Sequence, residues 1–329
     1  MDFSELDYQA KVRDSLNKIL TDKCSQDELK NFDDGFKHDD ALLSLLAENG
    51  YLGLGINEKF GGSGEDLYDL GILFERLGYY AAPLSLTGCL VDVAQTIQKF
   101  SEAETHRSIL KSIVKGEIYT SAILEPNNQD PENPITKAKF NGDRILVNGV
   151  KYLSEIASIA KSILVSVSSD EGVLLVLIDK DKVKLTPLAS TANSPIFKVE
   201  INDVTLDQSS IIHEKGRGLE ALRYLLQINM VMRSYIALGV AEKMTALIAS
   251  YTSEREQFGR VIGTFQAVSH RAADCFIELE CLRLVNQQAS VNLNTNHECE
   301  NDALISKIWA GNACHKISYS APVSYTHLR

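Results

Sequence analysis

The chain has 329 residues and a formal net charge of -11, with 44% hydrophobic and 23% charged residues. This composition is ordinary for a globular protein, and the length suffices for two or three packed units. The acidic balance argues against nucleic-acid binding, which needs clustered Lys and Arg. No apolar run approaches the roughly 20 residues that span a bilayer, so we expect no membrane span.

The N-terminal residues 1–7 are acidic and lack the character of a signal peptide. The six cysteines are scattered without a CxxC pair, which favours reduced thiols and argues against a metal site. Both observations predict a cytoplasmic protein, or one of the mitochondrial matrix if the source is eukaryotic.

Residues 1–117 are predicted to form an N-terminal helical domain. Apolar residues recur at helical spacing within residues 8–20, 41–46 and 67–77. The glycine-containing stretch 51–64 lacks both a preceding strand and a following Lys-Ser/Thr pair. We therefore interpret it as a tight connection between helices rather than a phosphate-binding loop.

Residues 118–212 change to short β-rich runs that are separated by turn residues. Asn141-Gly142 lies between two such runs and is a strong hairpin signal. Further strands are predicted at residues 163–167, 173–178 and 197–201. Their spacing and alternation predict a middle domain built as an antiparallel β-barrel or sandwich.

Residues 213–320 return to helical periodicity and predict a C-terminal domain of four-helix-bundle type. The expected apolar stripe of the first long helix comprises Ile236, Val240, Met244, Leu247 and Tyr251. That of the second comprises Val268, Ala272, Cys275, Leu279 and Leu282. Thr264 precedes the second helix and is expected to cap it. The order helical, β, helical predicts an α+β protein of several domains.

The stretch 253–270 joins these two helices and contains two glycines in its loop. It resembles the REQFG…FQAV…H signature of the flavin-dependent acyl-CoA dehydrogenases. The resemblance implies that Arg255, Gln257, Phe258 and Gln266 contact FAD that is bound by a neighbouring subunit. Without it, Arg255 would simply complement the helix dipole, Phe258 would be a core aromatic and Gln266 a surface amide. A guanidinium fork does suit pyrophosphate oxygens.

The domain order is also that of this family, so the resemblance covers essentially the whole chain. It implies an acyl-CoA substrate, an electron-transfer flavoprotein or similar acceptor, and a homo- or hetero-oligomer. The family continues beyond the helix predicted at residues 303–320, whereas here Pro322 is expected to break that helix. We therefore expect a truncated or misjoined C-terminal domain, with residues 321–329 as an anomalous tail.

Three departures from the family pattern fall in the β-rich domain. Leu124 stands where the family has a Thr at the flavin ring, although its backbone N–H can still donate. Residues 127–130 replace the Gly-Ser-Asp that holds the thioester. Residues 153–155 replace the Trp-Ile-Thr that stacks on and bonds the flavin. These changes resemble the shorter subunits of hetero-oligomers that act on bulky acyl-CoA thioesters such as sterol side chains.

Acyl-CoA desaturation needs a base, usually Glu, for the proton α to the thioester while hydride leaves for flavin N5. The family keeps this base at one of two positions, which fall near Asn229 and beyond the chain end. Asn229 cannot accept that proton, so no catalytic base is identified, and Glu155 is the alternative carboxylate. Arg233, one turn beyond Asn229, either faces the substrate or is a solvated helix residue.

Three hypotheses follow for the function. The chain is a catalytic FAD-dependent acyl-CoA dehydrogenase, a flavin-sharing non-catalytic subunit paired with a sister chain, or an interaction protein that kept the fold and lost the flavin. A flavin absorption band in the purified protein excludes the third, and the activity of the chain with and without a sister chain separates the first two.

Overall fold

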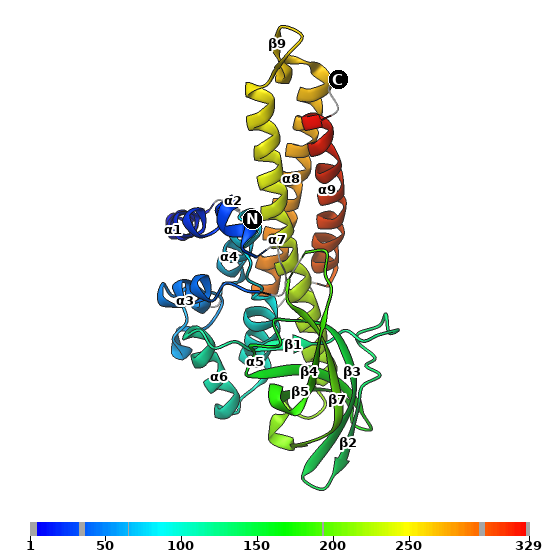
Figure 1. The fold of residues 1–329 in the computed structure, drawn as a ribbon. Coiled ribbons are helices and arrows are strands. Elements are labelled where there is room, and N and C mark those ends of the chain that lie inside the picture. The colour runs from blue at the N-terminus through cyan, green and yellow to red at the C-terminus, as the bar shows by residue number, and fades with distance from the viewer. Residues whose placement is uncertain (1–4, 33–36, 65, 193, 296–299, 327–329) are drawn as a thin grey trace. The chain divides into compact units, whose positions relative to one another are not determined.

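The computed structural model of the chain describes residues 5–32, 37–64, 66–192, 194–295 and 300–326. Figure 1 shows the fold of the chain, whose contacts divide it into two compact units. Unit 1 comprises Met1–Ser25, Leu67–Ala82 and Met230–Arg329, and unit 2 comprises Gln26–Asp66 and Pro83–Asn229. The three domain limits given above remain predictions.

The helices of unit 2 are short. They are α2 (Gln26–Lys30), α3 (Asp40–Glu48), the 3-10 turns η1 (Tyr51–Gly53), η2 (Glu58–Phe60), η4 (Lys180–Lys182) and η5 (Gln208–Ser210), the π-helix η3 (Thr87–Val93), α5 (Ala94–Phe100) and α6 (Glu104–Val114). The glycine-containing connection after α3 is tightly folded, because a Cβ at Gly62 would lie 2.0 Å from the carbonyl oxygen of Ile56. Only glycine fits that approach, which agrees with a tight turn rather than a phosphate cradle.

A seven-stranded sheet and the first part of α7 (Gly218–Glu254), as far as Asn229, form the rest of unit 2. The strands of the sheet are β1 (Thr120–Ala122), β2 (Lys137–Asn141), β3 (Arg144–Glu155), β4 (Ser162–Ser169), β5 (Gly172–Asp179), β6 (Lys184–Leu188) and β7 (Ile196–Asp207). The spatial order is β1-β4-β2-β3-β7-β6, with β5 on β4. The sheet is mixed rather than purely antiparallel, because β1 and β2 both run parallel to β4 while the other pairs are antiparallel.

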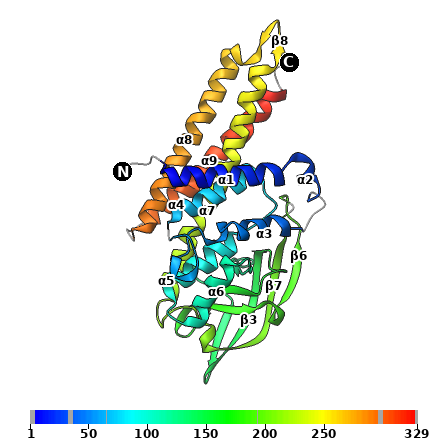
Figure 2. The same cartoon turned by 90° about the vertical axis from the view of Figure 1, so that its left-hand side faces the viewer.

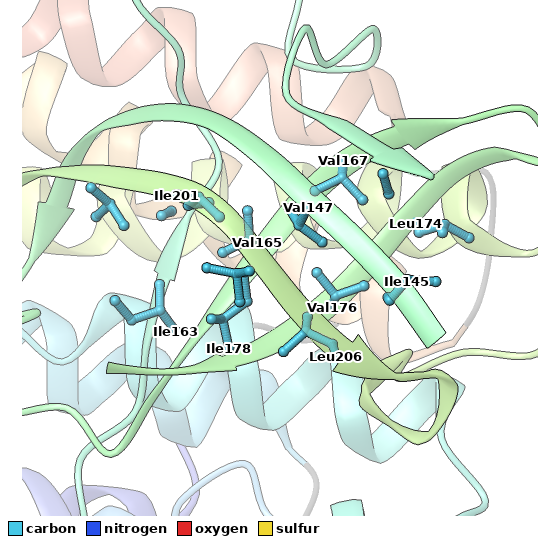
Figure 3. Close-up of a cluster of buried hydrophobic side chains, with 14 of the residues drawn as sticks. Ile145, Val147, Ile163, Val165, Val167, Leu174, Val176, Ile178, Ile201 and Leu206 are labelled. Atoms are coloured by element: carbon cyan, nitrogen blue, oxygen red, sulfur yellow. The ribbon is translucent and has the colours of Figure 1, made fainter. Parts of the chain in front are cut away.

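The strands are joined and packed much as their sequence pattern predicts. Asn141 pairs with Arg144, so the β2–β3 hairpin turns through Gly142 and Asp143, with Gly142 at φ 59. Alternate residues of the strands face one apolar cluster (Figure 3). The fully covered members include Ile145, Val147, Ile163, Val165, Val167, Val176 and Ile178. Strand β6 carries no clear pattern and was not predicted.

Unit 1 is helical apart from one small hairpin. It contains α1 (Asp7–Lys23), α4 (Leu67–Tyr79), α7 (Gly218–Glu254) from Met230 onward, β8 (Glu256–Gln257), β9 (Arg260–Val261), the 3-10 turn η6 (Ile262–Thr264), α8 (Gln266–Asn294) and α9 (Glu300–Thr326). The helices α7, α8 and α9 lie alongside one another in both views (Figures 1 and 2). Helix α4 meets α7 closely, since a Cβ at Gly239 would lie 1.8 Å from the backbone oxygen of Glu75.

Three expectations for the C-terminal helices were wrong. Helix α9 continues through Pro322, because a proline near a helix end removes only one hydrogen bond. The hydroxyl of Thr264 donates to the carbonyl of Val261 at 2.6 Å, and α8 begins after Phe265 without a side-chain cap. On α7 the expected stripe is partly exposed, with Leu247 at 57%.

The stripe of α7 was misplaced because apolar residues occur on more than one side of this helix. The residues that are buried instead include Tyr235, Leu238, Ala241 and Ile248. On α8 the prediction is confirmed for Val268, Cys275, Leu279 and Leu282, which are buried, while Ala272 is half-buried. None of the described helices combines the length and the apolar character that crossing a membrane requires.

Candidate functional site

A tight β-hairpin stands between the long helices α7 and α8. Gln257 pairs with Arg260, so the loop consists of Phe258 and Gly259, at φ 54 and 77. Two positive φ values are the pattern of a type I′ turn. Glycine adopts this conformation freely, but Phe258 pays strain for it, and strain of this kind is concentrated at functional sites. The Phe258 side chain is 79% exposed.

The hairpin and the start of α8 carry four of the residues predicted to contact a cofactor. Arg255, Gln257, Phe258 and Gln266 are all exposed. Within the described parts of the chain, the Arg255 guanidinium has no hydrogen-bond or ion-pair partner, although its backbone carbonyl accepts from Ile262 N at 2.8 Å. The hairpin thus presents a cation, an apolar ring and two amides to a molecule outside this chain.

Arg260 differs from Arg255 although it lies on the same hairpin. Its guanidinium lies over the Phe265 ring at 4.0 Å, and that ring packs edge-on against Phe258 at 6.3 Å. Helix α8 starts directly beyond, and its free N–H groups favour a negative charge. Of the two arginines, Arg255 is therefore the better candidate for an anionic ligand.

In unit 2, the positions that the family pattern places at the flavin ring lie shortly after β1 and at the end of β3. Leu124 and Leu153 are 46% and 50% exposed, and the Tyr152 N–H donates to the carbonyl of Leu124 at 2.8 Å. Leu153 and Ile156 adopt left-handed φ values of 58 and 46. The chain therefore displays two apolar side chains, of which Leu153 comes from a strained segment, where the family pattern has a hydroxyl and an aromatic.

Asn229, the position of the expected base, is bound to a carboxylate that the sequence pattern did not reveal. Its amide nitrogen donates to Oδ1 of Asp92 at 2.7 Å, and the Ser121 hydroxyl donates to the other oxygen. Asp92 belongs to η3 and is 3% exposed. The only local signal was one acidic residue inside an apolar run.

Glu155, the alternative carboxylate, is held by hydroxyl groups. Its Oε2 accepts hydrogen bonds from Ser85 and, at 2.7 Å, from Thr87. Its backbone oxygen accepts from Thr120 at 2.7 Å. These bonds tie Glu155 to the start of η3 and to β1. Arg233 is half-buried on α7, and its role toward a substrate stays a prediction.

A buried ion pair between Lys151 and Glu125 also escaped the sequence analysis. The Nζ of Lys151 lies 2.8 Å from Oε1 of Glu125, and both side chains are buried. Burial lowers the pKa of Lys151 to about 8, because this effect is larger than that of Glu125, which raises the pKa. Burial alone would raise the pKa of Glu125, but hydrogen bonds from Lys151, Thr136 and Asn128 outweigh it and hold the pKa at about 2.

Other parts of the described chain offer little more for catalysis. Among the described residues, no three His, Cys, Asp or Glu side chains come together as a metal site. A cavity of about 470 Å³ in unit 2 contains none of the predicted site residues. It is lined by Phe140, Gly142, Glu171, Leu174, Gln208, Ile211, His213, Lys215 and Gly216.

Comparison with known proteins gives a consistent result. The family profile described as acyl-CoA dehydrogenase, N-terminal domain, matches residues 7–117, and that of the C-terminal domain matches residues 216–322. Acyl-CoA dehydrogenase FadE27 of Mycobacterium tuberculosis is 26% identical over 333 residues, which cover 97% of this chain and 87% of the relative.

Two solved structures extend the likeness over nearly the whole chain. The Tcur3481-Tcur3483 steroid ACAD G363A variant has a TM-score of 0.90 and 28% identity, covering 97% of this chain and 87% of that one. The ChsE4-ChsE5 complex from Mycobacterium tuberculosis has a TM-score of 0.91 at 24% identity, covering 99% and 88%. At that identity the second likeness shows a common fold alone.

Proposed function

The chain belongs to the acyl-CoA dehydrogenase family, and we propose that it is one subunit of an oligomeric enzyme whose flavin site combines two chains. The activity of the family is FAD-dependent α,β-dehydrogenation of an acyl-CoA thioester, and FAD is its cofactor. The observation that carries the proposal is the short segment from the β8–β9 hairpin to the start of α8, where Arg255, Phe258 and Gln266 are all exposed.

The residues of the hairpin fit FAD chemically. The Arg255 guanidinium matches a pyrophosphate, and the uncapped start of α8 adds favourable N–H groups. Phe258 offers an apolar face, and the amides of Gln257 and Gln266 offer hydrogen bonds. When bound, FAD supplies the acceptor for the hydride that leaves the β-carbon of the substrate.

The β-rich part of the chain supplies different elements of the proposed site. The backbone N–H of Leu124 donates on the flavin-ring side, and the side chains of Leu124 and Leu153 cover the ring with apolar surface. We assign the hairpin and this β-rich surface to flavins in different subunits, as the family pattern implies. An electron-transfer flavoprotein or similar carrier is the proposed electron acceptor.

A bulky acyl group is the proposed substrate. It rests on the altered residues 127–130 and 153–155, which cannot hold a thioester and a flavin as the fatty-acyl pattern does. The relative named as a steroid enzyme supports the same class of substrate. Arg233 is proposed to face this substrate from α7.

A second candidate is a flavin-sharing subunit that has no base of its own. Two observations favour it: Asn229 donates to Asp92, and Glu155 accepts from Ser85 and Thr87. Both positions are engaged inside this chain. In this case the base comes from a sister chain, and this chain contributes its hairpin to the sister's flavin.

One experiment tests both candidates. The chain is purified alone and together with a sister acyl-CoA dehydrogenase chain, and each sample is examined for a flavin absorption band. Each is then mixed anaerobically with acyl-CoA thioesters of increasing bulk. Bleaching only with the sister chain supports the flavin-sharing subunit without a base of its own, and bleaching by the chain alone supports the catalytic subunit. Colourless protein in both samples overturns the proposal and favours an interaction protein.

A further inference from the structure

The buried pair Lys151 and Glu125 is the centre of a larger hydrogen-bond array in unit 2. Glu125 accepts from the backbone N–H groups of Ile135 and Thr136, both at 2.7 Å, and from the Asn128 amide at 2.8 Å. With Lys151, four donors therefore converge on one carboxylate. Glu125 lies near the start of the loop between β1 and β2, and its bonds to Ile135 and Thr136 fix the end of the loop to this start.

Lys151 fixes the other side of the same array. Its ammonium group also donates to the Ser166 hydroxyl at 3.0 Å and to the carbonyl of Ile123 at 3.2 Å. Ser166 belongs to β4, and Ile123 directly precedes Leu124. The one ammonium group therefore joins three parts of the domain through its three N–H bonds.

The loop itself is closed by further bonds among its own polar groups. The Asn128 amide donates to the carbonyl of Asn133 at 3.0 Å, and the Asn133 amide donates to Asp130 at 2.6 Å. The Asp130 N–H in turn donates to the Asn128 side chain at 3.0 Å. This segment is thus ordered around Glu125 rather than being an open loop.

Each member of the ion pair also lies two residues before a strained backbone position. Asn127 has φ 61 after Glu125, and Leu153 has φ 58 after Lys151. Non-glycine residues keep such conformations only where the surroundings hold them. The pair lies beside both segments that replace the family's thioester and flavin contacts.

A buried ion pair is a weak source of stability, because the cost of removing both charges from water cancels much of the attraction. Well-packed apolar residues of similar volume often stabilise a core equally well. What an apolar pair cannot supply is acceptors for two backbone N–H groups and donors for a carbonyl. The specific contribution of Lys151 and Glu125 is therefore the placement of the chain around them.

We propose that Lys151 and Glu125 are positioning residues, which hold residues 123–136 in the single geometry that the flavin ring and the thioester require. The inference rests on the proposed function for its ligands, but the placement of the loop belongs to the chain itself. Neither side chain touches a ligand, since both are buried. They act through the backbone beside Leu124 and through the loop of Asn128 and Asp130.

The test replaces the ion pair by apolar residues of similar size, in the double variant Lys151→Met with Glu125→Leu. The matched control is Lys161→Met with Glu117→Leu, which removes an exposed ion pair of the same unit. Hydrogen exchange of the Ile135 and Thr136 amides is measured in both, together with FAD affinity of the flavin-carrying assembly of the full chain.

We expect the double variant to remain folded while its Ile135 and Thr136 amides, which lose their acceptor, exchange at least about tenfold faster. Its FAD affinity should fall by at least about tenfold, and the control should change in neither measurement. If the single variants fail to fold, the double variant still gives the answer, because no unpaired charge is left buried.

Two results would overturn the inference. Unchanged amide exchange would show that the pair only fills space, and faster exchange with unchanged FAD affinity would show that the loop has no part in binding. Failure of the proposed function is distinguishable from both, because then the wild-type assembly itself would carry no flavin.

Discussion

The side-chain amide nitrogen of Asn229 lies 2.7 Å from Oδ1 of Asp92, a carboxylate that is only 3% exposed. The bond joins α7 to η3 inside unit 2. Asn229 occupies the position where the family pattern predicts a glutamate base. An amide satisfies this carboxylate as a donor, whereas a second carboxylate would repel it. The identity of residue 229 is thus coupled to Asp92.

Asn229→Asp should destabilise the protein by about 1–3 kcal/mol at pH 7, because it removes a donor and adds a like charge. The paired carboxyl group binds its proton more tightly in the folded state than in the unfolded state. The penalty should therefore shrink as the pH falls toward 4, by proton linkage. Urea unfolding at several pH values measures both effects.

Asn148→Asp is the matched control for this substitution. The Asn148 amide donates to Asp203 at 3.0 Å, but this pair is exposed to water, which screens the added charge. The control should change stability by at most about 0.5 kcal/mol. Equal losses in the two variants would mean that burial of Asp92 does not matter.

Arg255→Ala should weaken FAD binding by about 1.5–3 kcal/mol, because it removes a charge-assisted contact with phosphate. Arg260→Ala should cost about 0.5–1 kcal/mol of stability through the lost contact with Phe265 and leave FAD affinity nearly unchanged. Fluorescence titration of FAD into the assembled apoprotein measures the affinities. Equal weakening by the two substitutions would show that the wrong arginine is assigned.

Local sequence patterns predicted the elements that depend on local order. The hairpin at Gly142, the buried face of α8 and the loop between α7 and α8 all lie within short stretches of sequence, whereas the β8–β9 pairing inside that loop was not predicted. The buried stripe of α7 was misjudged, because apolar residues such as Leu247 occur on several of its sides and only the neighbouring helices select the covered one.

The contacts that organise the proposed site were invisible for a different reason. Asn229 and Asp92 are 137 positions apart, and Lys151 and Glu125 are 26 apart. No periodicity links such residues, so only the folded chain brings them together. The sequence did contain one indication that Lys151 is buried. Lys151 lies four residues after Val147 on β3, so both side chains point to the same, inward face of the strand.

Glu75 is the centre of a charge cluster in unit 1 that should control stability in acid. Arg13, Arg76 and Arg283 approach its carboxylate at 3.0, 2.8 and 2.9 Å. Burial alone would raise the pKa of Glu75, but the three guanidinium groups outweigh it and hold the pKa at about 2. Its contribution should be complete above pH 4.5, the ordinary pKa, and lost as the pH falls toward 2.

Glu75→Gln should cost about 1–3 kcal/mol at pH 7, because it removes the carboxylate that Arg13, Arg76 and Arg283 share and leaves them with their ion pairs to Glu5 and Glu242. The variant should also lose less additional stability than the wild type between pH 4.5 and pH 2. Chemical unfolding across this range gives both values. Glu102→Gln, at an exposed pair with Arg107, is the control. A parallel pH dependence in Glu75→Gln and wild type would contradict the assignment.

Flavin binding should depend on oligomerisation, because Arg255, Phe258 and Gln266 lie at the hairpin and the start of α8 while Leu124 belongs to the β-rich part of the chain. We expect FAD to elute only with dimers or larger assemblies. Size-exclusion chromatography with absorbance at the protein and flavin bands compares the amount of bound flavin with the oligomeric state. A monomer that holds stoichiometric FAD would show that one chain completes the site.

The isolated chain should not dehydrogenate a fatty acyl-CoA. The reaction needs a base within about 2.6–3.2 Å of the proton that it takes, and such a base contributes about a hundred- to ten-thousandfold in rate. Asn229 cannot accept the proton, and Glu155 already accepts bonds from Ser85 and Thr87. The segment at residues 127–130 also lacks the family's thioester contacts, so substrate orientation should suffer as well.

The measurement is anaerobic single turnover with short-, medium- and long-chain acyl-CoA, followed by flavin absorbance. Rapid bleaching by the chain alone would show that a base is present in it, and Asp92→Asn would then be the first variant to compare.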